Sequence, residues 1–188
     1  MSFYIGLLHY PVYNRWGDII ASAITNLDLH DLARLAKTYG AGKFYVINPL
    51  TDQEYLAKEI CRHWVSGYGA EYNRDRRDAM SLISIMSTLE ASIADIKDIE
   101  GEDPVLIATD AGRHRGKRVS YTLAREIISS HRVVMILFGT AWGLSKELIR
   151  KADYLLEPIF GVSDYNHLSV RTAAAITLDR LFSWFTKP

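Results

Sequence analysis

Three stretches in the second half of the chain combine glycine, polar and basic residues that can bind a ligand. Phe138-Gly-Thr-Ala-Trp-Gly143 follows a hydrophobic run, and its two glycines allow a ligand to approach the backbone closely. Asp164-Tyr-Asn-His-Leu-Ser-Val170 places a carboxylate, an amide and an imidazole before an apolar segment. Helix capping accounts for one or two of these polar residues but not for Asp164, Asn166 and His167 together.

The third stretch, residues 113–118, is strongly basic and contains no acidic residue. Its positive charges suit contacts with the phosphates of a nucleic acid, although a solvated turn has the same composition. An RNA contact is expected at Arg113, Arg115, Lys117 and Arg118.

Several common catalytic and metal-binding patterns are absent from the sequence. There is no Gly-x-Gly-x-x-Gly fingerprint and no Gly-Lys-Ser/Thr phosphate loop. The usual sequence motifs of dinucleotide-dependent hydride transfer and of nucleotide hydrolysis are therefore absent. No Gly-x-Ser-x-Gly turn indicates a serine hydrolase. Cys61 is the only cysteine and the histidines are scattered, so no metal site is expected.

The composition is that of a globular protein with no membrane segment. The chain has 188 residues, 48% hydrophobic and 23% charged, with 22 basic and 22 acidic side chains. No apolar run approaches the roughly 20 residues of a membrane helix, and the N-terminus lacks a signal-peptide pattern. We expect one cytoplasmic domain over residues 1–188. Neutrality is partly a cancellation, because residues 90–103 hold six acids against Lys97 and residues 113–118 are basic.

The elements that must position these residues alternate between strand and helix patterns. Strands are expected at Phe3–Leu8, Lys43–Ile47, Met80–Met86, Pro104–Thr109, Val133–Phe138 and Tyr154–Leu156. Helices are expected at Asn26–Tyr39, Thr51–Val65, Thr88–Ile99, Tyr121–Ser129, Leu144–Lys151 and Leu168–Phe185, and residues 74–79 form a polar connection or short helix. A Thr51–Glu54 capping box opens the second helix, and residues 12–22 form a loop.

This alternation predicts an α/β fold with a largely parallel sheet between helix layers. Ligands bind such sheets outside the carboxyl ends of the strands, which selects three loops: Thr109–Arg118, Gly139–Gly143 and Glu157–His167. The last helix is apolar nearly all round over Val170–Ile176. A helix of that kind is buried on more than one side, and a second copy of the chain is the expected cover, which predicts a homodimer.

The C-terminal stretch resembles the SPOUT superfamily of S-adenosylmethionine-dependent RNA methyltransferases, whose fold contains a trefoil knot. The resemblance lies in Ile136–Ser145, Ala152–Ile159 and Tyr165–Ile176, with His167 where the ribose-methylating branch has Asn. The N-terminal half matches as well. That branch spaces Asn, Arg and Gly six residues apart, and here Asp28, Arg34 and Gly40 occupy that frame. The similarity to a bacterial stand-alone family of RNA methyltransferases covers nearly the whole chain.

The resemblance implies a C-terminal knot and binding of S-adenosylmethionine, mainly by backbone groups of the three loops. The residues implied are Thr109, Asp110, Ala111, Phe138, Gly139, Gly143, Glu157, Pro158, Ile159, Gly161, Asn166 and Leu168. The implied substrate is tRNA or rRNA, and the implied assembly is a homodimer.

For catalysis, the resemblance implies that Arg34 assists the acceptor, and His167 and Asp164 are candidate proton acceptors. A guanidinium is a poor base, so an orienting or charge-stabilising role suits Arg34 better. Asp28 replaces Asn, and Ala141-Trp142 replaces the acidic residue of the glycine motif. The ribose 2′-oxygen and a base nitrogen, the latter with Asp164 or Asp31 as base, therefore both stay open as acceptors. The alternative from another class is a catalytically silent module that binds S-adenosylmethionine or RNA.

Overall fold

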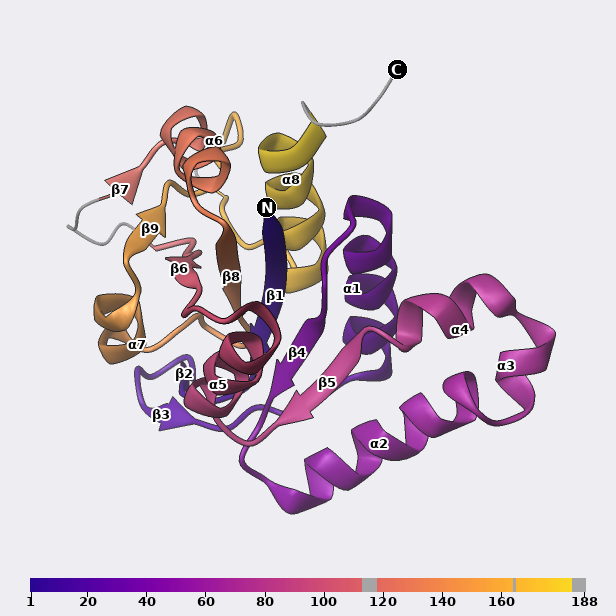
Figure 1. Cartoon of the computed structure of the whole chain (residues 1–188). Coiled ribbons are helices and arrows are strands. Elements are labelled where there is room, and N and C mark those ends of the chain that lie inside the picture. Colours follow the sequence, from indigo (N-terminus) through magenta and orange to yellow (C-terminus); the bar gives the residue numbers. More distant parts are fainter. Residues whose placement is uncertain (113–117, 164, 184–188) are drawn as a thin grey trace.

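The computed structural model describes residues 1–112, 118–163 and 165–183. Its centre is a seven-stranded sheet in the order β5-β4-β1-β8-β6-β9-β7, in which each neighbouring pair runs parallel (Figure 1). The strands are β1 (Ser2–Leu8), β4 (Phe44–Ile47), β5 (Ile83–Met86), β6 (Val105–Ala108), β7 (Arg118–Val119), β8 (Val133–Gly139) and β9 (Tyr154–Leu156). The predicted parallel α/β sheet is confirmed, and the trefoil knot stays a prediction.

Eight helices are present in the described residues. They are α1 (Asn26–Tyr39), α2 (Thr51–Val65), α3 (Tyr68–Tyr72), α4 (Arg74–Met80), α5 (Leu89–Glu100), α6 (Tyr121–Ser130), α7 (Lys146–Lys151) and α8 (Val170–Phe182). One apolar cluster joins one face of the sheet to α1, α4, α6 and α8, and a second joins the other face to α5 and α7. The α2–α4 segment extends away from the sheet beyond β5 (Figure 1).

The two central strands show why both faces of the sheet are covered. In β1, Phe3, Ile5 and Leu7 contribute to one apolar cluster, while Tyr4 and Leu8 contribute to the other. This is the two-residue side-chain alternation of a strand, with apolar residues on both faces. β1 pairs with β8 from Ser2–Val133 to Leu8–Gly139, so the carboxyl ends of both strands lie together.

The first helix follows the sequence prediction at both ends. Thr25 Oγ1 accepts a hydrogen bond from Asp28 N at 3.1 Å and donates one to Asp28 Oδ2 at 2.6 Å, which caps the helix reciprocally. Gly40 ends it with φ of 78°, in the left-handed region that favours glycine.

Several predicted boundaries were wrong. The predicted capping box of α2 is absent: Leu50 precedes the helix without a side-chain cap, and the Glu54 carboxylate pairs with Lys58. The predicted loop 12–22 contains a hairpin of β2 (Val12–Tyr13) and β3 (Ile19–Ile20). The strand expected from Met80 begins at Ile83, because α4 continues through Met80.

In the second half of the chain, the structure differs from the prediction in two further places. Arg118–Val119 pairs with β9, so β7 lies where only a loop was expected. The last helix begins at Val170 instead of Leu168, because Ser169 Oγ accepts from Thr172 N at 3.2 Å as its cap.

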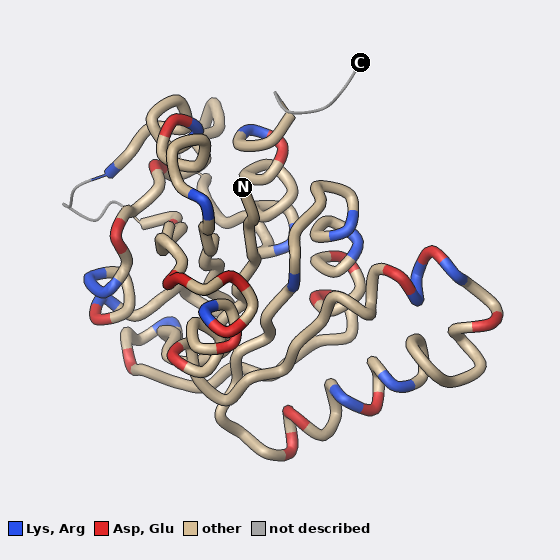
Figure 2. Tube along the Cα trace, viewed as in Figure 1, with Lys and Arg blue, Asp and Glu red and all other residues tan. Residues whose placement is uncertain are grey.

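The acidic residues predicted at 90–103 lie on α5 and directly after it (Figure 2), and several of them pair with basic side chains. Asp95 pairs with Lys43 at 2.8 Å, and Lys97 pairs with Asp103 at 2.8 Å. Burial acts to raise the pKa of Asp95, but hydrogen bonds from Lys43 and Tyr45 outweigh burial and lower it. Basic side chains of neighbouring elements therefore balance part of the charge of the acidic helix.

Candidate functional site

The three loops expected to bind a ligand follow adjacent strands, and direct contacts join them. After β6, Thr109 donates to Leu137 O of β8 from both N (3.0 Å) and Oγ1 (2.9 Å). Asn166 Nδ2 donates to Ala111 O at 3.0 Å, which connects the loop after β9 to the loop after β6. Residues separated by more than 50 positions in sequence thus meet at one edge of the sheet.

The turn after β8 needs both of its glycines. Gly143 has φ of 95°, and a Cβ there would lie 3.2 Å from Asp110 Oδ1. A Cβ on Gly139 would lie only 2.7 Å from Leu144 N. Ala141 also has a positive φ of 52°, which is uncommon for a residue with a side chain. The turn is therefore tightly folded, with the Asp110 carboxylate close beside it.

The segment after β9 has a backbone that is open for recognition. Residues 158–163 and 165–168 make no backbone–backbone hydrogen bond with any other described residue. Leu168 is half-exposed, and Phe160, Val162 and Tyr165 are strongly exposed. Glu157 differs from its successors, because its N donates to Val119 O and its Oε1 accepts from Tyr121 N at 2.9 Å. Its carboxylate therefore positions the start of α6.

The predicted RNA-contacting residues are only partly placed. Arg113, Arg115 and Lys117, together with the candidate base Asp164, lie outside the described residues. Arg118 Nη2 donates to Gly112 O, so its guanidinium turns back onto the loop after β6. The buried Arg118 Nε has no hydrogen-bond partner among the residues that the structure describes.

The catalytic candidates on α1 lie beside the start of α8. Arg171 Nε is 3.5 Å from Asp28 Oδ1, and Arg171 Nη1 is 3.6 Å from Asp31 Oδ2. Asp28 is buried by this contact, whereas Arg34 is exposed one turn beyond Asp31. Arg34 lies eight residues into the helix, about 12 Å along its axis from the carboxyl edge. No side-chain hydrogen bond or ion pair joins Arg34 to the three loops in the described part of the chain.

His167 lies on the exposed surface just before α8. Its ring packs edge-on against Tyr165, with ring centroids 5.5 Å apart and planes inclined by 66°. The structure thus places an exposed imidazole next to the loop after β9 and beside the Ser169 cap. His167 and the Asp31–Arg171 pair flank the same helix start.

A buried polar cluster closes the neighbouring part of the edge, over β1 and β4, and the sequence reasoning did not find it. His9 Nδ1 lies 3.0 Å from Ser22 Oγ, Ser22 Oγ lies 2.5 Å from Thr140 Oγ1, and Asn48 Nδ2 donates to Ser22 O at 3.0 Å. Burial lowers the pKa of His9 to about 4, while the Asp28 carboxylate partly opposes that shift. His9 Nε2 is buried without a hydrogen-bond partner in the described ranges. The sequence signal that could have revealed this cluster was the polar residue directly after each strand, His9 after β1 and Asn48 after β4.

The β2–β3 hairpin was also missed, although its sequence carried a signal. Val12-Tyr13 and Ile19-Ile20 are apolar pairs flanking Asn14-Arg-Trp-Gly-Asp18, a turn-type composition. The hairpin bonds to the turn after β8 through Tyr13 N to Gly143 O and Trp142 N to Tyr13 O, both 3.0 Å. It therefore forms part of the surroundings of the site.

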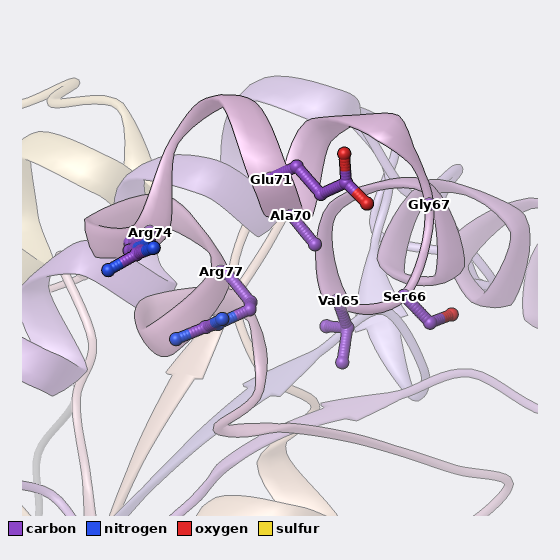
Figure 3. A pocket seen from close by; sticks show the side chains of 7 residues that line it. All are labelled: Val65, Ser66, Gly67, Ala70, Glu71, Arg74 and Arg77. Atoms are coloured by element: carbon purple, nitrogen blue, oxygen red, sulfur yellow. The ribbon is translucent and has the colours of Figure 1, made fainter.

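A further hollow of about 530 Å³ lies at the bends joining α2, α3 and α4 (Figure 3). Residues 65–67, Ala70, Glu71, Arg74 and Arg77 line it. Figure 3 shows Arg74 and Arg77 on α4 and Glu71 on α3. Arg77 pairs with Asp78 at 3.0 Å. This hollow lies away from the strand ends, where ligands of parallel sheets bind, so the three-loop site is the stronger candidate.

In the described ranges, no group of three or more His, Cys, Asp or Glu side chains is arranged to hold a metal ion. No helix in these ranges is both long and apolar enough to cross a membrane.

A family model identifies the family to which this chain belongs. The model described as "SAM-dependent RNA methyltransferase" matches residues 2–183. The chain belongs to this family. An uncharacterized protein of Aquifex aeolicus is 41% identical over 96% of this chain and 88% of its own length. A tRNA (guanine-N(1)-)-methyltransferase of Oleidesulfovibrio alaskensis is also 41% identical, but the match spans 96% of this chain and only 42% of that protein.

Solved methyltransferases have the same fold. A probable methyltransferase from Bordetella pertussis superposes with a TM-score of 0.65 at 18% identity, covering 98% of this chain and 96% of that one. An AdoMet-bound rRNA methyltransferase from Sinorhizobium meliloti gives 0.59 at 19% identity, covering 99% and 57%. The SpoU methyltransferase AviRb of Streptomyces viridochromogenes gives 0.58 at 15%, covering 97% and 59%. This confirms the predicted likeness to SPOUT methylases.

S-adenosylmethionine, the cofactor of this family of RNA methyltransferases, fits the site. The compact glycine turn leaves room for close approach to the backbone. The segment after β9 offers amide and carbonyl groups of the kind that recognise an adenine edge. The Asp110 carboxylate beside Gly143 suits a cationic or hydroxyl-bearing ligand. When bound, this cofactor supplies a methyl group activated by a positively charged sulfur.

Proposed function

We propose that this chain transfers the methyl group of S-adenosylmethionine to an RNA, either a tRNA or an rRNA. The acceptor is a ribose 2′-oxygen or a base nitrogen. The observation that carries the proposal is the convergence of three loops beyond β6, β8 and β9, where glycines and open backbone groups replace a side-chain pocket. Such an edge is where parallel α/β sheets bind their ligands.

Backbone and apolar groups of these loops hold the cofactor. They are Thr109, Asp110, Ala111, Phe138, Gly139, Gly143, Glu157, Pro158, Ile159, Gly161, Asn166 and Leu168. Glu157 acts through its main chain, because its carboxylate is already bonded to Tyr121 N. Arg113, Arg115, Lys117 and Arg118 provide the basic side of the RNA path.

The reaction forms one bond from the methyl carbon to the acceptor atom and breaks its bond to sulfur. The acceptor proton passes to a base, and S-adenosylhomocysteine leaves as a neutral thioether. Arg34 orients a phosphate of the RNA or stabilises charge on the acceptor, because a guanidinium keeps its proton near neutral pH. His167 and Asp164 are the candidate proton acceptors.

The active assembly in this proposal is a homodimer. Phe160, Val162, Tyr165 and Leu168 expose apolar surface beside the start of α8. Arg34 lies about 12 Å along α1 from the carboxyl edge of its own chain, so a second copy is well suited to bring an arginine to the acceptor. Sedimentation at micromolar concentration tests this assembly, and a monomer would contradict it.

Replacement of Arg34 by Ala tests the catalytic role. We expect methyl transfer to fall by about 100-fold or more, the range for loss of a charge-stabilising group. Affinity for S-adenosylhomocysteine, measured by calorimetry, should stay within a few-fold. Lys37→Ala, one turn further along the same exposed helix surface, is the matched control. Equal loss of cofactor binding in Arg34→Ala would make Arg34 a structural residue.

The substrate is tested with RNA from a strain that lacks this protein. Mass spectrometry of nucleosides from wild-type and deletion-strain RNA identifies the modified nucleotide and distinguishes ribose from base methylation. The guanine-N1 activity belongs by name to a relative of which this chain spans less than half, so it is one candidate among several. Binding of cofactor without transfer to any RNA fraction would favour the catalytically silent alternative. An RNA substrate would place the protein in the cytoplasm.

A further inference from the structure

The β1–α1 connection carries an exposed hairpin that is fastened to the cofactor turn. Besides the two bonds between Tyr13 and residues 142–143, Ser145 N donates to Pro11 O at 3.1 Å, and Val12 forms an antiparallel bridge with Leu144. Lys146 N also donates to the Tyr13 hydroxyl at 3.1 Å. In Figure 1, β2 and β3 lie beside α7, which begins at Lys146. The hairpin therefore has a fixed position relative to Gly143.

The tip of this hairpin is held rigidly by one side chain. Asn14 Oδ1 accepts from both Trp16 N and Asp18 N at 2.9 Å, and Asn14 Nδ2 donates to Asp18 Oδ2 at 3.0 Å. Gly17 takes φ of 88°, the left-handed conformation that lets the tip reverse. The tip is ordered before any ligand arrives, so little conformational entropy is lost when it binds one.

This ordered tip presents two groups to solvent. Trp16 is 71% exposed, and the Arg15 guanidinium lies 4.3 Å from the centroid of its ring. Trp142, in the turn to which the hairpin is bonded, is 60% exposed. Exposure of two indoles has a hydrophobic cost, and their display on a rigid hairpin and on the turn bonded to it indicates a binding role.

We propose that the Arg15–Trp16 tip is a stacking platform for an unpaired nucleobase of the RNA substrate, next to the nucleotide that is methylated. Arg15 covers one face of the indole and directs its N–H groups at a neighbouring phosphate, while the base stacks on the other face. Aromatic stacking combined with arginine contacts is the common chemistry of single-stranded nucleic-acid binding. The proposal rests on the proposed function, because the platform serves the RNA that this site would methylate.

A second copy of the chain is the competing occupant of this surface. The Arg15–Trp16 pair offers a fixed positive charge and an aromatic face together, which suits a phosphate and its neighbouring base, although arginine and tryptophan also occur at protein interfaces. The attachment of the hairpin to the cofactor turn also favours RNA, since the acceptor nucleotide must come within bonding distance of the methyl group held there.

The test measures binding of a short, unstructured, fluorescein-labelled RNA by anisotropy, alone and annealed to its complement. We expect the wild-type chain to bind the single strand more tightly than the duplex. Trp16→Ala should weaken single-strand binding about tenfold, within the range of one lost base stack. Trp16→Phe should retain most of the affinity, and Arg15→Lys should retain less than wild type because lysine lacks the planar guanidinium. Tyr55→Ala removes an equally exposed aromatic on α2 and is the matched control.

The outcomes separate this proposal from the proposed function. Calorimetry with S-adenosylhomocysteine should give the same affinity for wild type and Trp16→Ala. Unchanged RNA binding by Trp16→Ala overturns the platform and leaves the methyltransferase assignment intact. Absence of binding to this RNA by the wild-type chain, with or without S-adenosylhomocysteine, also overturns the platform, whereas the methyltransferase assignment is overturned by absence of methyl transfer to any RNA fraction. Conversion of a dimer to a monomer by Trp16→Ala, seen by sedimentation, would assign the surface to a second copy and also overturn the platform.

Discussion

Over β1 and β4, buried polar side chains close the carboxyl edge of the sheet, whereas over β6, β8 and β9 the same edge carries glycines and, among the described residues, a segment without backbone–backbone hydrogen bonds. In the closed half, His9 Nδ1, Ser22, Asn48 and Thr140 bond to one another or to nearby carbonyls. In the open half, Asn166 is the side chain that connects two of the loops. A parallel sheet presents strand ends along its whole edge, and this protein leaves only part of that edge for a ligand.

The difference shows how a binding site is confined. Thr140 stands at the boundary, because its hydroxyl donates to Leu8 O at 3.1 Å while its own turn continues to Gly143. The closed half holds the turn in place, and the open half leaves the turn accessible. Substitutions in the closed half should therefore change stability, and substitutions in the open half should change cofactor affinity.

The largest expected effect comes from the buried imidazole of the closed half. The pKa of His9 is about 4 when folded, against 6.5 for an ordinary histidine, so the unfolded chain takes up a proton below pH 6.5 that the folded chain refuses. Stability should therefore fall as the pH drops from 6.5 to 4, by about 3 kcal/mol in total from this group. Urea unfolding across that range measures it.

His9→Gln should remove this component of the pH dependence while lowering stability at pH 7. The exposed His63→Gln is the control for loss of an imidazole at the surface. An unchanged pH slope in His9→Gln would contradict the burial argument for the closed half.

The next largest effect concerns the glycine turn of the open half. Gly143→Ala imposes a side chain at φ of 95° and brings it to 3.2 Å from Asp110 Oδ1. We expect stability to fall by about 1 to 3 kcal/mol from backbone strain. Affinity for S-adenosylhomocysteine should fall about tenfold, because the added methyl group hinders close approach of the cofactor to the turn. Calorimetry measures the affinity.

Gly101→Ala separates strain from contact. Gly101 has φ of 82° at the end of α5, with no atom within 4 Å of the Cβ position. Gly101→Ala should lower the free energy of unfolding by an amount comparable to Gly143→Ala without lowering cofactor affinity. Equal affinity losses in both variants would mean that the turn after β8 has no special part in binding.

The smallest effect is expected at the side chain that joins two open loops. Asn166→Ala removes the 3.0 Å bond to Ala111 O on an exposed surface, so we expect cofactor affinity to fall a few-fold with little change in stability. Asn73→Ala removes a helix cap in α4 and should lower stability by about 1 kcal/mol without affecting binding. Unchanged cofactor affinity in Asn166→Ala would indicate that the loops are held by their backbones alone.

Much of the fold was predictable because its strands and helices carry strong local patterns. α1 matches its predicted range, since Thr25 and Gly40 supply start and stop signals and the apolar spacing is regular. The α2 cap was predicted wrongly because Thr51 is the first helical residue instead of the residue before the helix, and Glu54 pairs with Lys58. The hairpin is held largely by bonds to residues 142–146, which are distant in sequence.

The sequence by itself determined the family, the strand–helix alternation and the three loops at the carboxyl edge, because apolar periodicity, glycine positions and motifs are local properties. Only the tertiary structure decided how these parts meet. It bound Arg171 to Asp28 and Asp31, turned Arg118 onto Gly112, buried His9 beneath the turn and fastened the Trp16 hairpin beside Gly143. The physical reason is that each of these contacts joins elements from different parts of the chain, and its geometry exists only after the sheet brings their ends together.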